Sequence, residues 1–256
     1  MNLKWFDKLS PYYTLLKHWG FRYKCPICGY HSKDLAPVGI DLPVIREKRI
    51  IGAGLRNGGC YKCGATDRTK LVYTYLKKEL KVFKNPEKKV LHVAPEILIV
   101  KKFKDFKFKN YIQGDFFAEG QYNLEYDNSV QHMDIQEIPY PNNSFDLIIC
   151  NHVLEHVKCA HKALSEIFRV LKRRGVAILQ VPISETLLTT IEDNSVTSEK
   201  QREELYGQRD HVRLFGQDYP HLLSTHGFVV QRINLHNKYP SYGFNPKEDL
   251  FICSKD

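Results

Sequence analysis

The chain has 256 residues, of which 43% are hydrophobic by a wide count and 26% are charged. This length allows one substantial core and a small additional module. No run of eighteen apolar residues occurs, and the first residues, MNLKWFDKLSPYY, lack the apolar region of a signal peptide. The composition therefore argues against a membrane-spanning or secreted protein, and we expect a cytoplasmic one.

The formal charge of +9 is unevenly distributed along the chain. Residues 1–110 hold 24 Lys and Arg against 9 Asp and Glu, a balance of +15, whereas residues 111–256 hold 14 against 20, a balance of −6. The densest basic run, KKFKDFKFKN at 101–110, alternates Lys with Phe. It is typical of an amphipathic segment with a solvated Lys face, although a polyanion such as nucleic acid is a second possible partner.

Four cysteines predict a metal centre. CPIC and CYKC place Cys25 with Cys28 and Cys60 with Cys63, and a glycine follows each pair. Two such pairs supply the four thiolates of a closed, structural Zn²⁺ site, and disulfides are the less favoured interpretation. The 31 residues between the pairs exceed the usual spacing of about 15–20, and we expect the segment VIREKRIIGAGLRNGG there to form a hairpin of a zinc ribbon.

Alternating helices and strands follow the cysteines. ATDRTKLVYTYLKKELKVF predicts a helix with Thr66 or Asp67 as N-cap and Leu71, Tyr75 and Leu76 on one face. Expected strands are KVLHVA, NYIQGD, SVQHMD, FDLIICN and VAILQVP, and HKALSEIFRVLKRRG predicts a helix that ends at Gly175. This order predicts an α/β fold with a doubly wound, mostly parallel sheet, whose ligands bind at the carboxyl ends of the strands. We divide the chain into an N-terminal helical segment (1–20), a zinc ribbon (21–68) and a larger domain (69–256).

Carboxylates end two of the expected strands. Asp115 ends the second strand, 19 residues after Glu96, where a carboxylate can accept both hydroxyls of a ribose. Asp134 ends the third. A simpler explanation for both aspartates is that they stabilise a turn or cap a helix and bind no ligand.

The block around these residues resembles the class I S-adenosylmethionine-dependent methyltransferases, over residues 88–235. The similarity lies in the Asp after the third strand, the approach IPYPNNSFD, the strand LIICN, the segment HVLEHV and the helix ending RVLKRRG. It implies a seven-stranded, Rossmann-like sheet and S-adenosylmethionine as cofactor. The roles that it implies are the ribose diol for Asp115, the adenine amino group for Asp134, the adenine ring for Ile135, and the methionine end for Asn151 and His152.

The first turn of this block departs from the family. Where the family has D-x-G-x-G, this chain has His92 for the acidic residue, Ala94 for the first glycine and Glu96 for the second. S-adenosylmethionine carries no phosphate, so a turn of glycine amides is dispensable, and Glu96 could serve the cofactor's ammonium or ribose. We interpret the site as rebuilt and not lost. HVAPE, with CGATDR after the second cysteine pair, also resembles a subgroup of zinc-ribbon methyltransferases associated with glycan and small-molecule tailoring.

Candidate catalytic residues lie in two segments. HVLEH, residues 152–156, matches the H-x-x-E-H signature of some zinc proteases, but it follows a parallel strand and no third ligand is evident. The segment EDNSVTSEKQREELYGQRDHVRLFG predicts an irregular lid over the acceptor. We expect His211 as base, its tautomer fixed by Asp210 and the acceptor held by Arg213, with His156, on a helix after the fourth strand, as second choice.

The sequence therefore predicts an enzyme that methylates an oxygen of a sugar, glycan or other small polar metabolite. One alternative is an RNA base methyltransferase that uses the basic half of the chain to hold phosphates. The other is a noncatalytic zinc-ribbon binding module with a degenerate cofactor fold.

Overall fold

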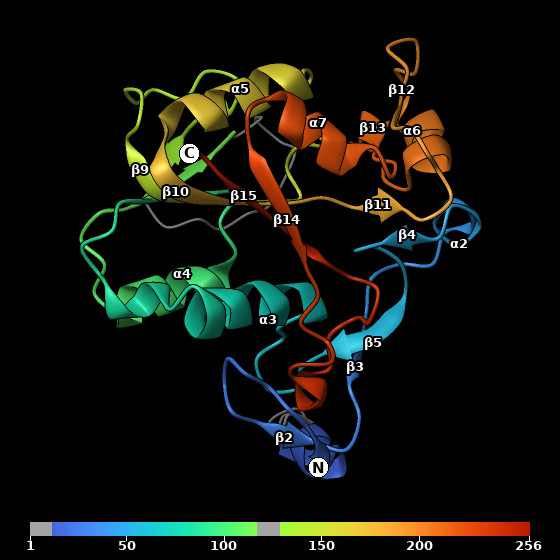
Figure 1. Cartoon of the computed structure of the whole chain (residues 1–256). Coiled ribbons are helices and arrows are strands. Elements are labelled where there is room, and N and C mark those ends of the chain that lie inside the picture. Colours follow the sequence, from blue (N-terminus) through green and yellow to red (C-terminus); the bar gives the residue numbers. More distant parts are fainter. Residues whose placement is uncertain (1–11, 117–128) are drawn as a thin grey trace, which may run out of the picture.

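The computed structural model describes residues 12–116 and 129–256 and centres on a seven-stranded sheet (Figure 1). The strand order is β14-β15-β10-β9-β6-β7-β8; the five strands from β10 to β8 are parallel, and β15 runs antiparallel to both of its neighbours. The strands are β6 (Val90–Val93), β7 (Tyr111–Asp115), β8 (Val130–His132), β9 (Phe145–Asn151), β10 (Leu171–Gln180), β14 (Val229–Ile233) and β15 (Leu250–Ser254). This is the predicted doubly wound sheet, and its order reverses between β6 and β9, where such sheets bind ligands.

Helices cover both faces of the sheet. Alternate residues of β9 show why: Leu147 and Ile149 pack in one apolar cluster with α3 and α4, whereas Ile148 and Cys150 pack in another with α5 and α7. Strands buried on both faces need continuous apolar runs, and FDLIICN supplies one. The helices are α3 (Asp67–Thr74), α4 (Ile97–Asp105), α5 (Ala160–Val170) and α7 (Tyr219–Thr225).

Two predicted helices differ in how far they extend. α3 begins at the predicted cap, since the Thr66 side chain accepts from Thr69 N at 3.2 Å, and it continues as the π-helix η1 (Tyr75–Glu79) and the 3₁₀ helix η2 (Val82–Lys84). The prediction that the next helix ends at Gly175 is wrong. α5 stops at Val170 because the following residue, Leu171, already pairs with Phe145 of β9.

The N-terminal part is built from short elements: a helix at residues 12–17, β1 (Trp19–Lys24) paired with β2 (His31–Ser32), and β3 (Ala36–Val38) paired with β5 (Arg56–Gly59). Residues 1–11 of the predicted N-terminal helical segment lie outside the described residues. The predicted hairpin between the cysteine pairs is wrong. Its first half forms α2 (Pro43–Glu47), with proline in the first turn where no amide donor is needed, and β4 (Ile50–Ile51) pairs with β11 (Ile183–Ser184) of the larger part.

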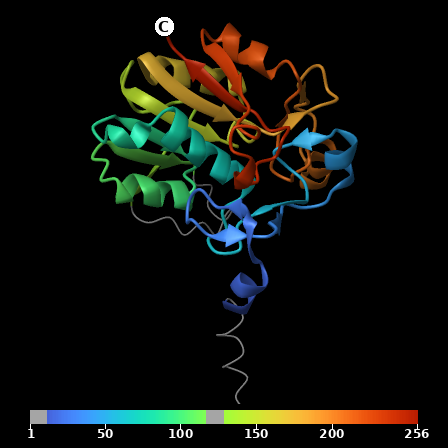
Figure 2. The same cartoon turned by 60° about the horizontal axis from the view of Figure 1, so that its bottom comes forward.

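The β4–β11 pair joins the cysteine-bearing part to the rest of the molecule. An apolar cluster continues the contact, with Val44, Ile45 and Ile50 against Tyr206 and Leu214. Figures 1 and 2 both show α2 and β4 beside α6 and β11. The division at residue 68 stays a prediction, and the segment between the cysteine pairs packs on the larger domain.

The segment after β11 holds an unpredicted helix. β12 (Ile191–Glu192) and β13 (Arg213–Leu214) pair with each other, and α6 (Glu199–Tyr206) lies between them in the sequence. Ser198 caps α6 by accepting from Gln201 N, and Gly207 ends it at a φ of 86°. The expectation of an irregular lid is therefore wrong for these residues. Near the C-terminus a 3₁₀ turn, η3 (Pro240–Tyr242), precedes β15. None of the described helices is both long and apolar enough to cross a bilayer.

Candidate active site and four-cysteine centre

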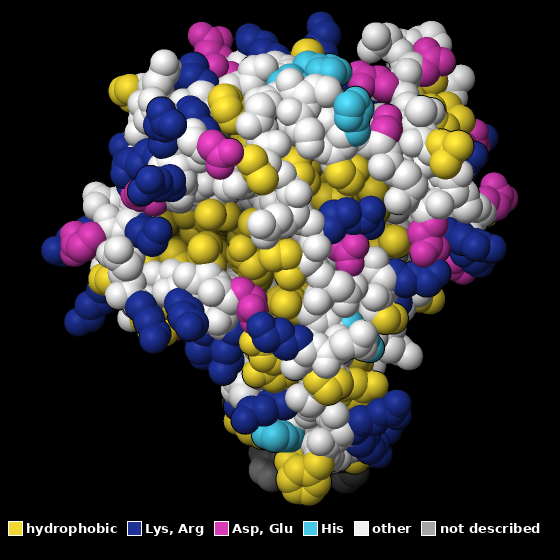
Figure 3. Space-filling model, in the orientation of Figure 1, with side chains coloured by type: hydrophobic (Ala, Val, Ile, Leu, Met, Phe, Trp, Pro, Cys, Tyr) yellow, Lys and Arg dark blue, Asp and Glu magenta, His cyan; other side chains and the backbone are white. Residues whose placement is uncertain are grey.

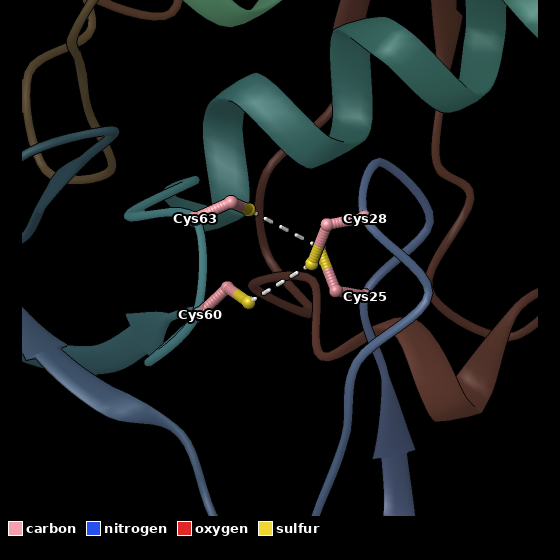
Figure 4. A group of neighbouring side chains, drawn as sticks. All are labelled: Cys25, Cys28, Cys60 and Cys63. Atoms are coloured by element: carbon pink, nitrogen blue, oxygen red, sulfur yellow. Dashed lines mark hydrogen bonds between the residues drawn. The ribbon is translucent and has the colours of Figure 1, made fainter. Parts of the chain in front are cut away.

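The four predicted cysteines come together at one point (Figure 4). Cys25 Sγ lies 3.7 Å from Cys63 Sγ, and Cys28 Sγ lies 3.7 Å from Cys60 Sγ. A tetrahedron with Zn–S bonds of about 2.3 Å has S–S edges of about 3.8 Å. Two S–S distances therefore match such an edge, and all four sulfurs lie within 4.8 Å of one another, an arrangement whose donors suit Zn²⁺.

Both cysteine pairs form the same local turn. Gly29 N donates to Cys25 O and Gly64 N to Cys60 O, each at 2.9 Å. Gly29 and Gly64 have φ values of 75° and 71°, which glycine adopts without steric cost. The glycine after each pair is therefore required by the turn, as the sequence predicts.

At the carboxyl edge of the sheet, the glycine-poor turn holds a buried polar network. His92 is completely buried, and its ring contacts Glu96 through Nε2 and the Tyr111 hydroxyl through Nδ1, the latter at 2.7 Å. Asn151 Nδ2 donates to the other oxygen of Glu96 at 3.0 Å. Burial alone would raise the pKa of Glu96, but the His92 charge and these hydrogen bonds lower it. A carboxylate one turn further along thus restores the negative charge that is missing at position 92.

Ala94 retains a glycine-like backbone. Its φ is 46°, in the left-handed region, and His152 at the end of β9 has a φ of 54°. Residues other than glycine pay roughly 1–2 kcal/mol for this conformation. Such strain concentrates at functional sites, and here it lies on two adjacent strands at the point where the sheet order reverses.

Replacing Ala94 with Gly should relieve this strain and raise the free energy of unfolding by about 1 kcal/mol. Urea denaturation followed by circular dichroism measures the change. Ala163→Gly, inside α5, is the control and should lower the same quantity by about 1 kcal/mol or more. Equal losses in the two variants would show that residue 94 does not need a left-handed backbone.

The residues expected to hold the adenosine part lie at the ends of β7 and β8. Asp115 ends β7, and its Oδ1 accepts from Phe116 N at 2.8 Å. Asp134 follows β8 and accepts from Gln136 N at 2.8 Å, the local turn contact that is the simpler explanation for this residue. Ile135 beside it is buried. Residues 117–128, which follow β7 in the sequence, lie outside the described part of the chain.

Two adjoining cavities lie at this edge of the sheet and share Arg68 and His152. The smaller, which we call the Glu96 cavity, has a volume of about 110 Å³. The larger, the His211 cavity, has a volume of about 330 Å³. The Glu96 cavity is lined by Arg68, Thr69, Leu71, Val72, Glu96, Asn151, His152, Gln180, Glu248 and Leu250.

The His211 cavity is enclosed by both parts of the molecule. One wall comes from residues 38–56, between the cysteine pairs, together with Thr66 and Arg68. The other wall comes from His152, Glu155, His156, Pro182 and residues 206–211. The segment between the two cysteine pairs is therefore part of the candidate active site.

The predicted catalytic residues have different partners from those expected. Asp210 Oδ2 lies 3.1 Å from Nδ1 of His156, not beside the His211 ring, whose Nδ1 lies 3.3 Å from Tyr206 O. The two histidine rings pack edge to face, with centroids 4.7 Å apart. His156 lies in a turn before α5 and not on a helix, because α5 begins only at Ala160.

Arg213 has a structural position. Its guanidinium is 1% exposed, pairs with Glu192 and donates to the backbone carbonyls of Leu154, Val157 and Lys158. These contacts occupy its donors and fix the turn that carries Glu155 and His156. They leave little capacity for the expected contact with an acceptor.

Burial shifts the pKa values of this cluster. It lowers the pKa of His156 to about 4 and that of His211 to about 3, so both rings are neutral near pH 7. Burial also raises the pKa of Glu155 to about 8. Its Oε1 lies 3.2 Å from His152 Nδ1, yet neither oxygen makes a hydrogen bond of good geometry to any described residue.

Two residues of the site were not assigned from the sequence. Arg68, the last residue of CGATDR, lines both cavities and donates to Gly52 O at 3.0 Å. Glu248 is 2% exposed, and neither of its oxygens has a hydrogen-bond partner in the described part of the chain. Burial raises its pKa to about 7. The motif CGATDR is the sequence signal that could have identified Arg68. No local pattern marks Glu248, because it reaches the cavity from a loop far away in the sequence.

The basic Lys/Phe run packs as an amphipathic segment. Phe103 is fully buried and Phe108 contacts it edge-on at 4.8 Å, while Phe106 stacks on Phe83 at 4.6 Å. Lys and Arg side chains gather over the part of the surface where α4 lies (Figure 3). Phe103 and Phe108 therefore pack against the core, as the favoured amphipathic interpretation predicts, whereas Phe106 is 41% exposed.

Comparisons with known proteins find similarity over parts of the chain. A family model described as a methyltransferase domain matches residues 105–179, from the end of α4 to β10. An uncharacterized protein of Methanocaldococcus jannaschii is 44% identical over 55 residues, which cover 22% of this chain and only 24% of that protein.

Similar solved structures include the YcgJ protein of Bacillus subtilis, with 20% identity, coverage of 63% of this chain and 71% of that chain, and a TM-score of 0.44. A SAM-dependent methyltransferase of Archaeoglobus fulgidus has 16% identity, coverage of 73% and 94%, and a TM-score of 0.45.

Proposed function

We propose that this chain, which carries a class I S-adenosylmethionine-dependent methyltransferase domain, transfers the cofactor's methyl group to a hydroxyl of a small polar acceptor. Sugars, glycans and other polar metabolites are the acceptors that we have in mind. The observation that carries the proposal is the pair of adjoining cavities at the carboxyl edge of the sheet, with Arg68 and His152 at their common boundary. One cavity suits the cofactor's reactive end, and the other suits an acceptor.

The cofactor's adenosine part would lie over the ends of β7 and β8. Asp115 would bind the ribose diol, Asp134 the adenine amino group, and Ile135 would pack on the adenine ring. When bound, S-adenosylmethionine supplies an electrophilic methyl group on a sulfonium centre. The fold's part is to fix this group in front of the acceptor.

The methionine part would occupy the Glu96 cavity. Its carboxylate needs a cation, which Arg68 supplies, and its ammonium needs an anion, which Glu96 or the unpartnered Glu248 supplies. Asn151 holds Glu96 in place, and His152 lies where this cavity meets the larger one. The cavity thus places a cation, Arg68, and two carboxyl groups, Glu96 and Glu248, where the two charges of a zwitterion need partners.

The acceptor would occupy the His211 cavity, whose volume of about 330 Å³ fits a small molecule. Its hydroxyl oxygen attacks the methyl carbon in line with the carbon–sulfur bond, which breaks and leaves its electron pair on sulfur. The hydroxyl proton must leave, and we place its acceptor at the His156–His211 pair, with His211 as first choice. Asp210 orients His156 in this arrangement.

Two further assignments complete the proposal. Zn²⁺ is the ion that we place between Cys25, Cys28, Cys60 and Cys63, where it would anchor the segment that encloses the acceptor. We place the protein in the cytoplasm, because thiolate ligands require a reducing compartment.

Calorimetry with S-adenosylmethionine tests the cofactor site. Asp134→Ala should weaken binding about tenfold or more, since a hydrogen bond that involves a charged group contributes roughly 1.5–3 kcal/mol. Arg68→Met should weaken it by at least as much from the other end of the ligand. Asp193→Ala, on an exposed turn, is the control.

Wild-type protein that binds no cofactor at millimolar concentration would overturn the proposal. If the cofactor binds, an acceptor screen with labelled methyl groups follows, using polar metabolites, glycans and a tRNA pool. Label found only in tRNA would replace the metabolite acceptor with an RNA base.

A further inference from the structure

One wall of the His211 cavity carries a cluster of three metal-binding side chains. Glu155, His156 and His211 each present a ligand atom, and these atoms lie within 4.8 Å of one another. Glu155 and His211 are buried, and His156 is partly buried. The cluster is separate from the four cysteines, and its two nitrogens and one oxygen are the ligand set of many catalytic metal sites.

The carboxylates of this cluster lack partners. Neither oxygen of Glu155 and neither oxygen of Asp210 has a hydrogen-bond partner of good geometry among the described residues. Glu155 is 1% exposed, so water does not solvate it freely. Buried carboxylates are normally paired or bound to metal, because burying an uncompensated charge is very costly. Arg68 and Arg213 lie near enough to lower the pKa of Glu155, but burial outweighs them, and no described group makes a hydrogen bond of good geometry to its oxygens.

The imidazoles are held as metal ligands usually are. His156 Nδ1 lies 3.1 Å from Asp210 Oδ2, and His211 Nδ1 lies 3.3 Å from Tyr206 O. The Tyr206 carbonyl can only accept, so His211 Nδ1 carries the proton and the lone pair of that ring lies on Nε2. His156 Nδ1 is within ion-pair distance of Asp210 but makes no hydrogen bond of good geometry to it. A histidine ligand typically donates its second nitrogen to a carboxylate or a backbone carbonyl in this way.

We propose that Glu155, His156 and His211 bind one divalent transition-metal ion in the wall of the His211 cavity. At bond lengths of about 2.1 Å the ligand atoms would be about 3.0–3.4 Å apart, so binding would draw them together. His152, whose Nδ1 lies 3.2 Å from Glu155 Oε1, is a further candidate donor. Two imidazoles and one carboxylate suit Zn²⁺, Mn²⁺, Fe²⁺ and Co²⁺ better than Ca²⁺.

The catalytic consequence of this ion rests on the proposed methyl transfer, although its binding does not. Three protein ligands would leave the ion with open coordination positions, and all three residues line the cavity. An acceptor hydroxyl bound there would become more acidic, so its proton could pass to water while its oxygen attacks the methyl group. His156 and His211 would then act through the ion and not as bases themselves.

Mn²⁺ is the probe, because it prefers nitrogen and oxygen donors to thiolates. The full chain is treated briefly with chelator, its remaining zinc is quantified by mass spectrometry, and Mn²⁺ is titrated by calorimetry and electron paramagnetic resonance. We expect one Mn²⁺ per chain with the ribbon zinc in place. Glu155→Gln, which keeps the side chain's shape, and His211→Asn should each weaken binding about a hundredfold or more, since losing an outer-shell partner alone costs roughly 10–100-fold.

His161→Asn is the control, because this exposed histidine contacts His226 and should bind Mn²⁺ as wild type does. Thermal unfolding checks the fold: Mn²⁺ should raise the midpoint of wild type and of the control but not that of Glu155→Gln. Wild type that binds neither Mn²⁺ nor Zn²⁺ beyond the ribbon equivalent would overturn the site, as would unchanged binding in both ligand variants. Methylation assays separate the two proposals: metal binding without methyl transfer contradicts only the proposed function, whereas full-rate transfer after chelation contradicts only the ion's catalytic role.

Discussion

Cys28→Ala is expected to abolish methyl transfer, although no cysteine lines either cavity in the described part of the chain. Structural zinc contributes about 10–16 kcal/mol of apparent binding free energy in small modules, so the turns around the four cysteines should unfold without it. The segment between the pairs would then lose its anchors at both ends. The wall of the His211 cavity that residues 38–56 form would then be lost as well.

Mass spectrometry should find one zinc fewer per chain in this variant, and circular dichroism should still detect the large sheet. Cys159→Ala is the matched control, because Cys159 is exposed and lies apart from the four-cysteine cluster. Zinc that is retained in Cys28→Ala, or full activity after its loss, would refute the assignment of the metal to these four ligands.

His211→Ala is expected to lower turnover by about a hundredfold or more, the usual range for a group that removes a proton or orients the group that does. Affinity for S-adenosylmethionine should change little, since His211 lines only the larger cavity. Steady-state kinetics with calorimetry on the same variant separates these effects. If turnover survives in His211→Ala but collapses in His156→Ala, proton removal belongs to the turn after β9 and not to the segment after α6.

Sequence reasoning succeeded where the signal is local. The two-residue spacing within each cysteine pair predicts a metal-binding turn. That turn requires a residue with positive φ after each pair, and Gly29 and Gly64 supply it. Asp115 ends β7, and Asp134 follows soon after the last residue of β8, close to the strand ends that the sequence pattern predicts.

It failed where the partner is distant in sequence. Asp210 was assigned to its neighbour His211, but consecutive residues rarely face each other, and its partner in the fold is His156. The sequence predicts that Arg213 binds the acceptor, because its neighbours in the sequence give no sign that its guanidinium donates to three backbone carbonyls of the turn before α5. One error was avoidable: Ser198 and Gly207 are good cap residues, and they delimit α6.

The β4–β11 pairing also bears on how the protein is made. Ile51 pairs with Ile183, so more than half of the chain must leave the ribosome before this contact can form. The four cysteines are complete at residue 63 and can take up metal early during synthesis, whereas the cavity closes only when residues 206–211 have emerged. Loop closure across such a span is slow compared with local folding. A nascent chain should therefore gain its metal well before it gains an acceptor site, and ribosome-bound chains ending just before α6 should hold zinc without being able to methylate.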